Sequence, residues 1–315
     1  MSKKINVAVL MGGKSAEHDI SLITGGEVVK NLDSKKYRAL SIVISKDGKL
    51  FKFNDKNYPL SQLSAIQCQL FFIAMHGSSG EDGRIQGFLD FLGVAYTGSG
   101  VLASALGMDK LYSRKLFTQA GLTVPKTVAV KKGKTIPKLN FDFPVFVKPN
   151  NQGSSVGVFK VKNKKELVSA LKKSHKYSDQ ALVEESVDGV EVTSSILGKE
   201  KPVALPLVEI VPKTQFFNYK AKYNERFCEE IVPARISKIL TKKAKAAAIL
   251  AYQTIGCQGF GRVDMIIKNN KVYVLEVNTI PGLTAVSLLP KAAKATGISY
   301  RQLLNEIISF AHPIV

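Results

Sequence analysis

The sequence predicts an α/β protein with two or three domains. Over residues 1–108, short apolar segments alternate with helical patterns, an order typical of an open, mostly parallel sheet. Later apolar segments are joined by glycine-containing turns and loops, as in antiparallel pairs. The chain of 315 residues is long enough for two or three domains with sizeable cores.

The composition indicates a globular protein in a reducing compartment. No apolar run approaches the roughly 20 residues that cross a bilayer, so we expect no membrane partner. The apolar run at residues 5–11 is short and leads into a glycine turn without a cleavage site, which favours a first strand over a signal peptide. Cys68, Cys228 and Cys257 are widely spaced and odd in number, which indicates a cytoplasmic protein without a disulfide frame or zinc site.

The net charge of +20 has two interpretations. A basic chain can bind nucleic acid. Here the lysines form short scattered groups, such as Lys131-Lys132 and Lys242-Lys243, and no basic stripe alternates with aromatic residues. We therefore expect a lysine-rich surface that attracts anionic substrates, with no nucleic-acid partner.

The first predicted strand, residues 5–10, leads through Gly12-Gly13 into a helix from about Ala16. This order resembles a strand–glycine loop–helix unit, but the full GxGxxG spacing of a dinucleotide site is absent. Glu17 falls in the first turn of the predicted helix. Its carboxylate either complements the helix dipole or holds a substrate ammonium.

Further apolar strands are predicted at residues 39–44 and 70–75. His76 follows the second of these directly, at the C-terminal end of a strand. Open α/β sheets bind their ligands at that edge. Residues 93–100 then lead into another helix.

A second domain is predicted to begin near Asp109, which is a suitable N-cap for a helix over 110–120 that ends at Gly121. Strands are predicted at 144–149 and 155–161.

The segment NNQGSSVG links these two strands. A Gly/Ser loop between antiparallel strands can fold over phosphates, because it offers backbone N–H groups and hydroxyls. It is not a Walker loop, since GxxxxGK[ST] is missing and no helix follows. Lys148 lies inside the preceding strand, which favours a nucleotide contact over simple solvation.

Residues 181–197 read as two strands around the bend at Asp188-Gly189. Three acidic residues cluster there: Glu184, Glu185 and Glu191. One of them could accept a hydrogen bond from a ribose hydroxyl, or all three could be surface charges. A further strand is predicted at 203–210.

Residues 212–235 break the pattern, because they are rich in charges and aromatics and show no sustained periodicity. A loop this long in a compact enzyme is usually a functional lid or disordered. The aromatic residues favour the lid: Phe216, Phe217, Tyr219 and Tyr223. Helices are predicted over 241–255 and from Ser299, and their apolar faces indicate core packing.

The segment 259–288 carries three hard oxygen ligands, Asp264, Glu276 and Asn278. Two carboxylates and an amide are what a Mg²⁺ site offers when phosphate oxygens complete the shell. Arg262 faces the same way as Asp264, and a cation there suggests stabilisation of an anion that develops during reaction. The alternative is an ordinary hairpin with charges on its wet face.

The register of this hairpin tests the metal site. A two-residue turn at Asn269-Asn270 would place Asp264 opposite Leu275, on the opposite face from Glu276. A shared site therefore requires a three-residue loop, a bulge or a similar odd shift. We expect an even sum of paired residue numbers, set by a connection longer than Asn269-Asn270 alone.

Seven segments occur together in one order: GGKSAEHDIS, HGSSGEDGRIQG, GMDK, VKPNNQGSSVGV, YKAKY, GFGRVD and EVNTIPGLT. In this order and spacing, over essentially the whole chain, they resemble the D-alanine–D-alanine ligases, ATP-grasp enzymes of peptidoglycan synthesis. The resemblance implies an α/β (α+β ATP-grasp) fold. It would comprise a pre-ATP-grasp domain at 1–108, a central lobe at 109–193 and a C-terminal lobe at 194–315, with the 212–235 loop as lid.

The resemblance also implies ATP and Mg²⁺ or Mn²⁺ as cofactors, with two ions held by Asp264, Glu276 and Asn278. Nucleotide contacts are implied at Lys110, Lys148, Ser155, Glu184, Glu185, Val187, Glu191 and Lys222. Gln152 and Ser186 depart from the family pattern, where a carboxylate and an aromatic residue are frequent. These departures affect local ATP contacts rather than the reaction.

The substrate residues are implied in the same way. Glu17 would bind the ammonium of the first D-alanine, linked through Ser154 and Tyr223, with His76 lining that site. Arg262 and the Gly282 backbone would stabilise the tetrahedral oxyanion. The second D-alanine would bind at Ser287 and Leu288.

The implied reaction joins two D-alanine molecules through a D-alanyl phosphate, releasing ADP and phosphate, in a cytoplasmic enzyme that by the family's habit is a homodimer. The alternative is a related ATP-grasp carboxylate–amine ligase, including the D-alanine–D-lactate type. Tyr223 favours the dipeptide product, because depsipeptide ligases tend to lack this tyrosine.

Overall fold

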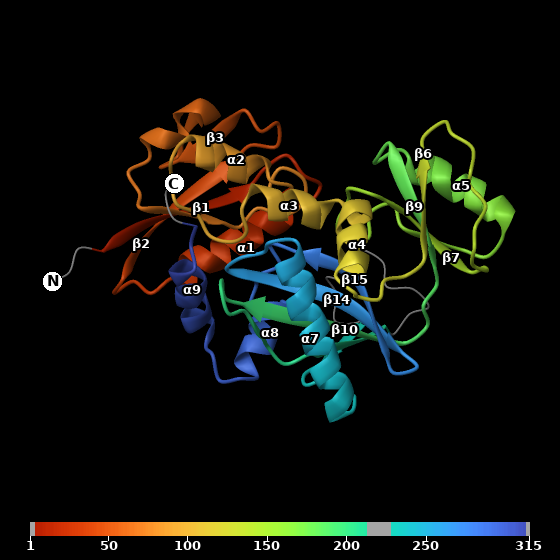
Figure 1. Ribbon diagram of the computed structural model, residues 1–315. Coiled ribbons are helices and arrows are strands. Elements are labelled where there is room, and N and C mark those ends of the chain that lie inside the picture. Colours follow the sequence, from red (N-terminus) through yellow and green to blue (C-terminus); the bar gives the residue numbers. More distant parts are fainter. Residues whose placement is uncertain (1–3, 213–227, 313–315) are drawn as a thin grey trace.

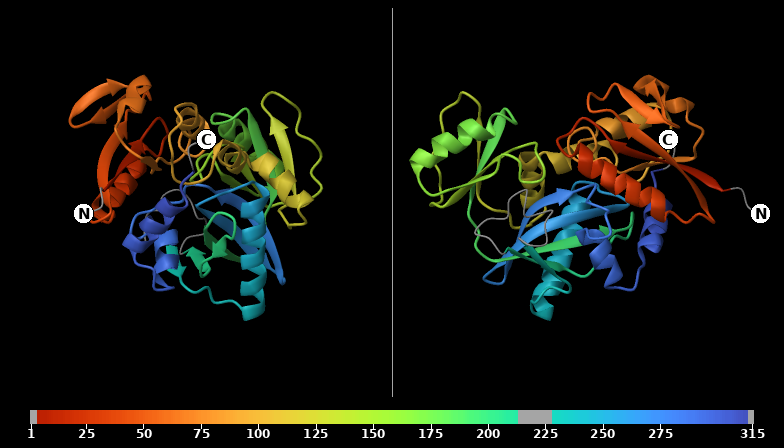
Figure 2. Two further views of the ribbon diagram at one scale, coloured as in Figure 1. Left: turned by 60° about the vertical axis from the view of Figure 1, so that its left-hand side comes forward. Right: turned by 180° about the vertical axis from the view of Figure 1, so that it is seen from behind.

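The computed structural model describes residues 4–212 and 228–312. Three sheets organise it (Figure 1): a five-stranded N-terminal sheet, a four-stranded sheet and a six-stranded sheet. The four-stranded sheet with its helix stands apart from the N-terminal sheet, and the six-stranded sheet lies below both (Figure 2). None of the helices within the described ranges is long and apolar enough to cross a membrane.

The N-terminal sheet has the order β4-β3-β2-β1-β5. Its strands are β1 (Ile5–Gly12), β2 (Tyr37–Ile44), β3 (Leu50–Phe53), β4 (Lys56–Pro59) and β5 (Leu70–Ile73). Strand β1 pairs in parallel with β2 and β5, as predicted, but β3 and β4 add an antiparallel hairpin. The expectation of a mostly parallel sheet is therefore wrong for the β3–β4 edge, where each strand has only four residues, too few to show a clear periodicity.

Helices flank this sheet and position the motif segments. They are α1 (His18–Asn31), the 3-10 helix η1 (Leu60–Ala65), α2 (Arg84–Phe91) and α3 (Val101–Met108). Helix α1 begins two residues later than predicted, so Glu17 occupies its N-cap and makes no side-chain cap hydrogen bond. His76 follows β5 at the C-terminal edge of the sheet, as expected.

The four-stranded sheet is antiparallel, with the order β6-β9-β7-β8. Its elements are β6 (Thr127–Lys131), β7 (Val145–Pro149), β8 (Phe159–Val161) and β9 (Gln180–Glu185), with α4 (Lys110–Gln119) before it and α5 (Lys164–Ser174) against it. Asp109 caps α4 by accepting a hydrogen bond from the Tyr112 amide, which confirms the predicted helix start. The strand predicted over 155–161 is shorter, because Ser154 and Ser155 adopt positive φ angles of 49° and 57° and turn the chain.

The six-stranded sheet is antiparallel, with the order β13-β12-β10-β14-β15 and β11 beside β10. Its strands are β10 (Val190–Leu197), β11 (Val203–Ala204), β12 (Val208–Pro212), β13 (Cys228–Ile231), β14 (Phe260–Lys268) and β15 (Lys271–Asn278). The single strand predicted over 203–210 is divided into β11 and β12. The predicted loop 212–235 is wrong for 228–231, which form β13; residues 213–227, including Lys222 and Tyr223, lie outside the described ranges.

Helix α7 (Lys238–Thr254) covers one face of this sheet, and α8 (Leu288–Lys294) and α9 (Tyr300–Ser309) follow the hairpin. Alternate residues of β14 and β15, such as Val263 and Val277, pack in one core with the alanine face of α7. Residues between them, including Arg262 and Asp264, point to the other face and line a cavity. Leu303 and Ile307 of α9 join the core of the N-terminal sheet, so the end of the described chain packs back against its beginning.

The β14–β15 hairpin resolves the register question. Asn269 and Asn270, with φ of 48° and 61°, form the two-residue turn, and Lys268 pairs with Lys271. The register then shifts between Asp264 and Met265, so that Asp264 lies opposite Glu276. The predicted odd shift is confirmed as a bulge. The expectation of a longer connection is wrong, because the extra residue is Leu275 in β15.

Candidate active site

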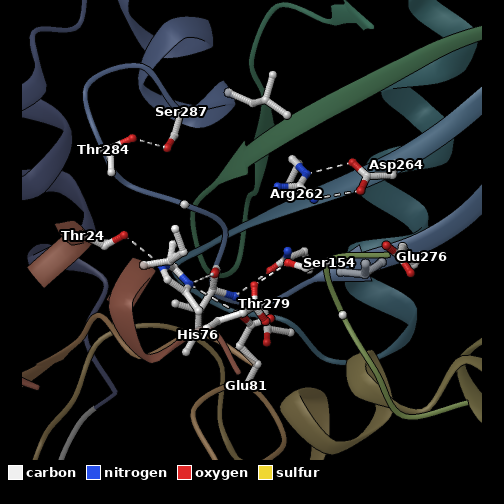
Figure 3. A pocket seen from close by; sticks show the side chains of 18 of the residues that line it. Thr24, His76, Glu81, Ser154, Arg262, Asp264, Glu276, Thr279, Thr284 and Ser287 are labelled. Atoms are coloured by element: carbon white, nitrogen blue, oxygen red, sulfur yellow. Dashed lines mark hydrogen bonds and ion pairs between the residues drawn. The ribbon is translucent and has the colours of Figure 1, made fainter. Parts of the chain in front are cut away.

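A cavity of about 620 Å³ lies where the three sheets meet. Figure 3 shows side chains that line it, from β14 and β15, the Ser154 loop, α1 and the His76 loop. It brings together most of the residues predicted for the substrates and the metal: Glu17, His76, Ser154, Arg262, Asp264, Glu276, Asn278, Gly282, Ser287 and Leu288. Lys110 and Glu191 of the predicted nucleotide set also line it.

Arg262 and Asp264 form a two-pronged ion pair on β14. The Nε and Nη2 groups of Arg262 each donate to one Asp264 oxygen at 2.8 Å. Thr193 on β10 donates its hydroxyl to Asp264 Oδ1 at 2.8 Å. Burial lowers the pKa of Arg262, but the Asp264 carboxylate outweighs burial and raises it overall. The guanidinium is therefore a fixed positive charge inside the cavity.

Glu276 and Asn278 extend the polar row on β15. Lys110 Nζ lies 3.2 Å from Glu276 Oε2 and donates to the Gln152 carbonyl at 2.6 Å. The Asn278 side-chain oxygen accepts from the Ile280 amide at 3.2 Å. Lys110 thus joins the Gly/Ser loop to the predicted metal ligands.

The donor set fits Mg²⁺. Asp264 pairs with Glu276 and Arg262 with Asn278 across the two strands, so all three oxygen ligands face the cavity. Asp264 pairs with Arg262 and Glu276 with Lys110, so each carboxylate lies beside a positive charge at the cavity wall. Over residues 4–212 and 228–312, no three His, Cys, Asp or Glu side chains are placed to bind a metal by themselves. Two carboxylates and one amide oxygen suit Mg²⁺, because this ion keeps waters and phosphate oxygens as its other ligands.

The Ser154 loop meets the start of α1 at another end of the cavity. Ser154 donates its hydroxyl to the Glu17 carboxylate, and Ser15 accepts from the Glu17 amide at 3.0 Å while donating to the His76 carbonyl at 2.6 Å. Glu17 is only 9% exposed. A carboxylate held in this way is suited to a ligand ammonium, and it serves no capping role for α1.

His76 is buried in a network that the sequence did not predict. Its Nε2 lies 2.8 Å from the Thr24 hydroxyl, and its Nδ1 lies 3.1 Å from the Ile280 carbonyl and 3.5 Å from Glu81. Burial lowers the pKa of His76, but hydrogen bonding and charge from Glu81 raise it overall. Burial raises the pKa of Glu81. Glu81 follows His76 in the same motif, and that shared motif was the only signal for its role.

The loop before α8 forms a further end of the cavity. The hydroxyls of Thr284 and Ser287 lie 2.7 Å apart. A Cβ on Gly282 would stand 2.9 Å from the Ser287 hydroxyl, so a larger residue there would displace the Ser287 side chain. On the same side, Lys291 of α8 lies 2.8 Å from Glu230 of β13, and both line the cavity. The sequence offered no motif for this pair.

Of the remaining predicted nucleotide residues, those within the described ranges do not line this cavity, and Lys222 lies outside those ranges. Lys148 Nζ lies 2.5 Å from Glu184 Oε2, and Arg114 contacts the same carboxylate. Glu185 accepts from the Lys126 amide at 2.9 Å. Ser155 lies in the turn between β7 and β8, Val187 follows β9, and both are half-buried.

An antiparallel four-stranded sheet and an antiparallel six-stranded sheet, with lysines and metal-type carboxylates between them, define an ATP-grasp ligase. The family descriptions "D-ala D-ala ligase N-terminus" and "D-ala D-ala ligase C-terminus" match residues 6–66 with 55–99 and residues 116–309, respectively. The chain belongs to the D-alanine–D-alanine ligase family.

Individual relatives agree with this family. The chain is 41% identical over 320 residues to a D-alanine–D-alanine ligase of Syntrophobacter fumaroxidans, covering 98% of both chains. It is also 41% identical to that of Carboxydothermus hydrogenoformans, covering 96% of this chain and 97% of the relative. Among solved structures, it resembles VanG D-Ala:D-Ser ligase from Enterococcus faecalis (TM-score 0.86, 31% identity, 98% and 99% covered) and D-alanine–D-alanine ligase from Bacillus anthracis complexed with ATP (TM-score 0.81, 33% identity, 97% of each covered).

Proposed function

We propose that this enzyme uses ATP to join two D-alanine molecules into D-alanyl-D-alanine, releasing ADP and phosphate, for peptidoglycan precursor synthesis. The observation that carries the proposal is the single cavity that connects Glu17, Arg262 and Ser287. It offers a carboxylate for one ammonium, a cation for a developing anion, and a hydroxyl for a second substrate. Full-length relatives named for this reaction support it.

The first step activates a carboxylate. An oxygen of the first D-alanine attacks the γ-phosphorus of ATP, an O–P bond forms, and the bond to the bridging oxygen breaks to release ADP. Glu17 orients the substrate through its ammonium, and Ser154 fixes the Glu17 carboxylate. Lys110 places positive charge beside Glu276, where it would neutralise charge on the transferring phosphoryl group. Asp264, Glu276 and Asn278 would hold Mg²⁺ or Mn²⁺, two ions in all, which neutralises phosphate oxygens when bound.

The second step forms the peptide bond. The amine of the second D-alanine attacks the acyl carbon of D-alanyl phosphate, and phosphate leaves with the electron pair of the broken C–O bond while the amine loses a proton. Asp264 engages the Nε and Nη2 groups of Arg262, which leaves Nη1 to stabilise the oxyanion together with the Gly282 amide. Ser287 and Leu288 would receive the second D-alanine.

Other expectations become part of the same proposal. The division at 1–108, 109–193 and 194–315, the lid role of 212–235, and the contacts of Lys148, Ser155, Glu184, Glu185, Val187, Glu191 and Lys222 with ATP all follow from the family assignment. Tyr223 would join the link that Glu17 forms with Ser154. A cytoplasmic location follows from the use of ATP, and a homodimer is the assembly we expect.

The test is phosphate release with product analysis by mass spectrometry. We expect ADP, phosphate and D-alanyl-D-alanine with D-alanine and Mg²⁺, and no product with L-alanine. D-serine and D-lactate are offered as competing second substrates, because the chain resembles a D-Ala:D-Ser ligase. Absence of D-alanyl-D-alanine would overturn the proposal. Salt-sensitive binding of duplex DNA without nucleotide hydrolysis would favour the nucleic-acid alternative.

A further inference from the structure

Arg114 is a buried cation to which neither the sequence motifs nor the proposed mechanism assigns a role. It lies on α4 one turn after Lys110, and residues four apart share a helix face. Its exposed fraction is 3%, whereas the neighbouring Lys115 is exposed. Arginine is rarely buried without partners, so its contacts identify its role.

The Arg114 guanidinium joins both ATP-grasp sheets. Its Nη1 donates to the Thr127 hydroxyl of β6 at 2.8 Å and forms an ion pair with Glu184 of β9. Its Nη2 donates to the Leu275 carbonyl of β15 at 3.2 Å. Leu275 is the bulged residue, which has no partner across the β14–β15 ladder and immediately precedes Glu276. One side chain therefore connects the Glu184 strand to the bulge that orients Glu276.

Glu184 is shared by two cations. Arg114 contacts its Oε1 and Lys148 Nζ lies 2.5 Å from its Oε2, with the carboxylate only 3% exposed. Although burial raises the pKa of Glu184, the charges of Arg114 and Lys148 outweigh burial and lower it. A buried carboxylate that loses its last counter-ion is strongly destabilised. If Lys148 moves away from Glu184, the buried carboxylate keeps a counter-ion only while Arg114 remains in contact with it.

We propose that Arg114 is a positioning residue for the nucleotide: it is the permanent counter-ion of Glu184, so that Lys148 can exchange Glu184 for an ATP phosphate. The contact with the Leu275 carbonyl holds β9 and the Glu276 bulge at a fixed separation during this exchange. The inference rests on the proposed function, since it requires ATP at Lys148. It adds a residue that allows Lys148 to leave Glu184 for the nucleotide.

The test compares Arg114→Met with Lys115→Met, which removes an exposed lysine from the same helix. Binding of a non-hydrolysable ATP analogue is measured by calorimetry, and KM for ATP, KM for D-alanine and kcat are measured separately. We expect R114M to raise the Kd of the analogue and KM for ATP by roughly tenfold or more, the loss of one charge-assisted contact. KM for D-alanine should stay within about twofold, and K115M should match the wild type.

Two further variants separate counter-ion loss from damage to the fold. Arg114→Lys keeps the charge but a single ammonium cannot reach Thr127, Glu184 and Leu275 together, so we expect an intermediate Kd and a folded protein. In the double variant R114M/E184Q no buried carboxylate retains Lys148. Analogue affinity should recover relative to R114M, up to that of the single variant E184Q, which lacks the same proposed Glu184 contact with ATP. Thermal unfolding is followed for every variant, and R114K decides the question if R114M does not fold.

The inference is overturned if the wild type makes product with ATP while R114M, or R114K where R114M is unfolded, binds the analogue as tightly as the wild type. It is also overturned if KM for D-alanine rises as much as KM for ATP, or if E184Q restores nothing in the R114M background. A wild type that binds no ATP would instead overturn the proposed function, and this inference with it.

Discussion

Asp264 and Glu276 lie directly opposite each other on β14 and β15, although the two-residue turn at Asn269-Asn270 alone would place Leu275 opposite Asp264. The bulge at Leu275 turns Glu276 and Asn278 to the cavity face and Val277 to the α7 core. Bulges re-aim side chains next to active sites. The metal-type carboxylates therefore face one another because one residue was added to the strand.

This relationship makes Glu276→Gln a direct test of the metal site. The substitution keeps the shape and the strand but removes a charge from the ion-binding row, so we expect turnover to fall by at least about 100-fold. Melting temperature should change little, because the Glu276 side chain is 27% exposed and glutamine can still accept a hydrogen bond from Lys110. Near-normal turnover with Mg²⁺ would contradict its assignment, and Lys271→Gln on the same strand is the control.

The hairpin also shows how far sequence could go. Side chains on a strand alternate between its two faces, so assigning Asp264 and Glu276 to one site required an odd shift in the register of the hairpin. The structure has such a shift. The position of that shift was not predictable, because Asn269-Asn270 is a complete turn by itself and Leu275 resembles any strand residue. Turn chemistry is local, but a bulge is fixed by packing on both faces.

The site shows the same limit. Residues within contiguous motifs, such as Glu17, His76 and Arg262, were predicted and line one cavity. Arg114 and Thr193 were missed, because each acts through a partner far away in sequence, Glu184 or Asp264. A buried arginine in an amphipathic helix, or a threonine in a strand, carries no local signal of such a partner.

Thr193→Val tests how Asp264 is held. The Thr193 hydroxyl donates to Asp264 Oδ1 at 2.8 Å, and valine keeps the shape without the donor. We expect the Mg²⁺ concentration for half-maximal rate to rise about tenfold, as for other groups that orient a metal ligand. The cost in unfolding free energy should be about 1 kcal/mol.

Ser194→Ala is the control for that variant. Ser194 is the next residue on β10, fully buried, and its hydroxyl has no hydrogen-bond partner within the described ranges. Its removal should leave the Mg²⁺ dependence unchanged. If T193V titrates with Mg²⁺ like S194A, then Thr193 does not orient Asp264.

His76 and Glu81 predict a sign for the pH dependence of stability. The pKa of His76 is raised in the folded state, because Glu81, Glu17 and the Ile280 carbonyl together outweigh burial. The stabilising contribution of His76 is therefore complete below about pH 6.5. That contribution is lost as the pH rises through the higher folded pKa, because the folded protein then releases the extra proton. The raised pKa of Glu81 acts in the same direction.

Glu81→Gln should weaken this trend. Without the carboxylate, only the Glu17 charge and the Ile280 carbonyl oppose burial, so the pKa of His76 falls and stability should decline less between about pH 6 and 7.5. The measurement is urea unfolding of both proteins across that range. One proton changes the slope of unfolding free energy against pH by at most about 1.4 kcal/mol per pH unit. Parallel curves for the wild type and E81Q would show that Glu81 does not set the protonation of His76.

Lys291 and Glu230 predict selectivity between the two D-alanine sites. Their 2.8 Å pair lies on the Ser287 side of the cavity, away from Glu17 in sequence and in the fold. A zwitterionic second substrate would meet Lys291 with its carboxylate and Glu230 with its ammonium. Lys291→Met should therefore raise the apparent KM of the second D-alanine by roughly fivefold at low salt, with a smaller effect at high salt.

Initial rates over a wide range of D-alanine concentration separate the two sites in this experiment. The first-site constant and kcat should stay within about twofold, because Glu17 and Arg262 keep their contacts. Lys294→Met removes an exposed lysine from the end of the same helix and should leave both constants unchanged. An equal change at both sites, or one that ignores salt, would mean that the pair only holds β13 against α8.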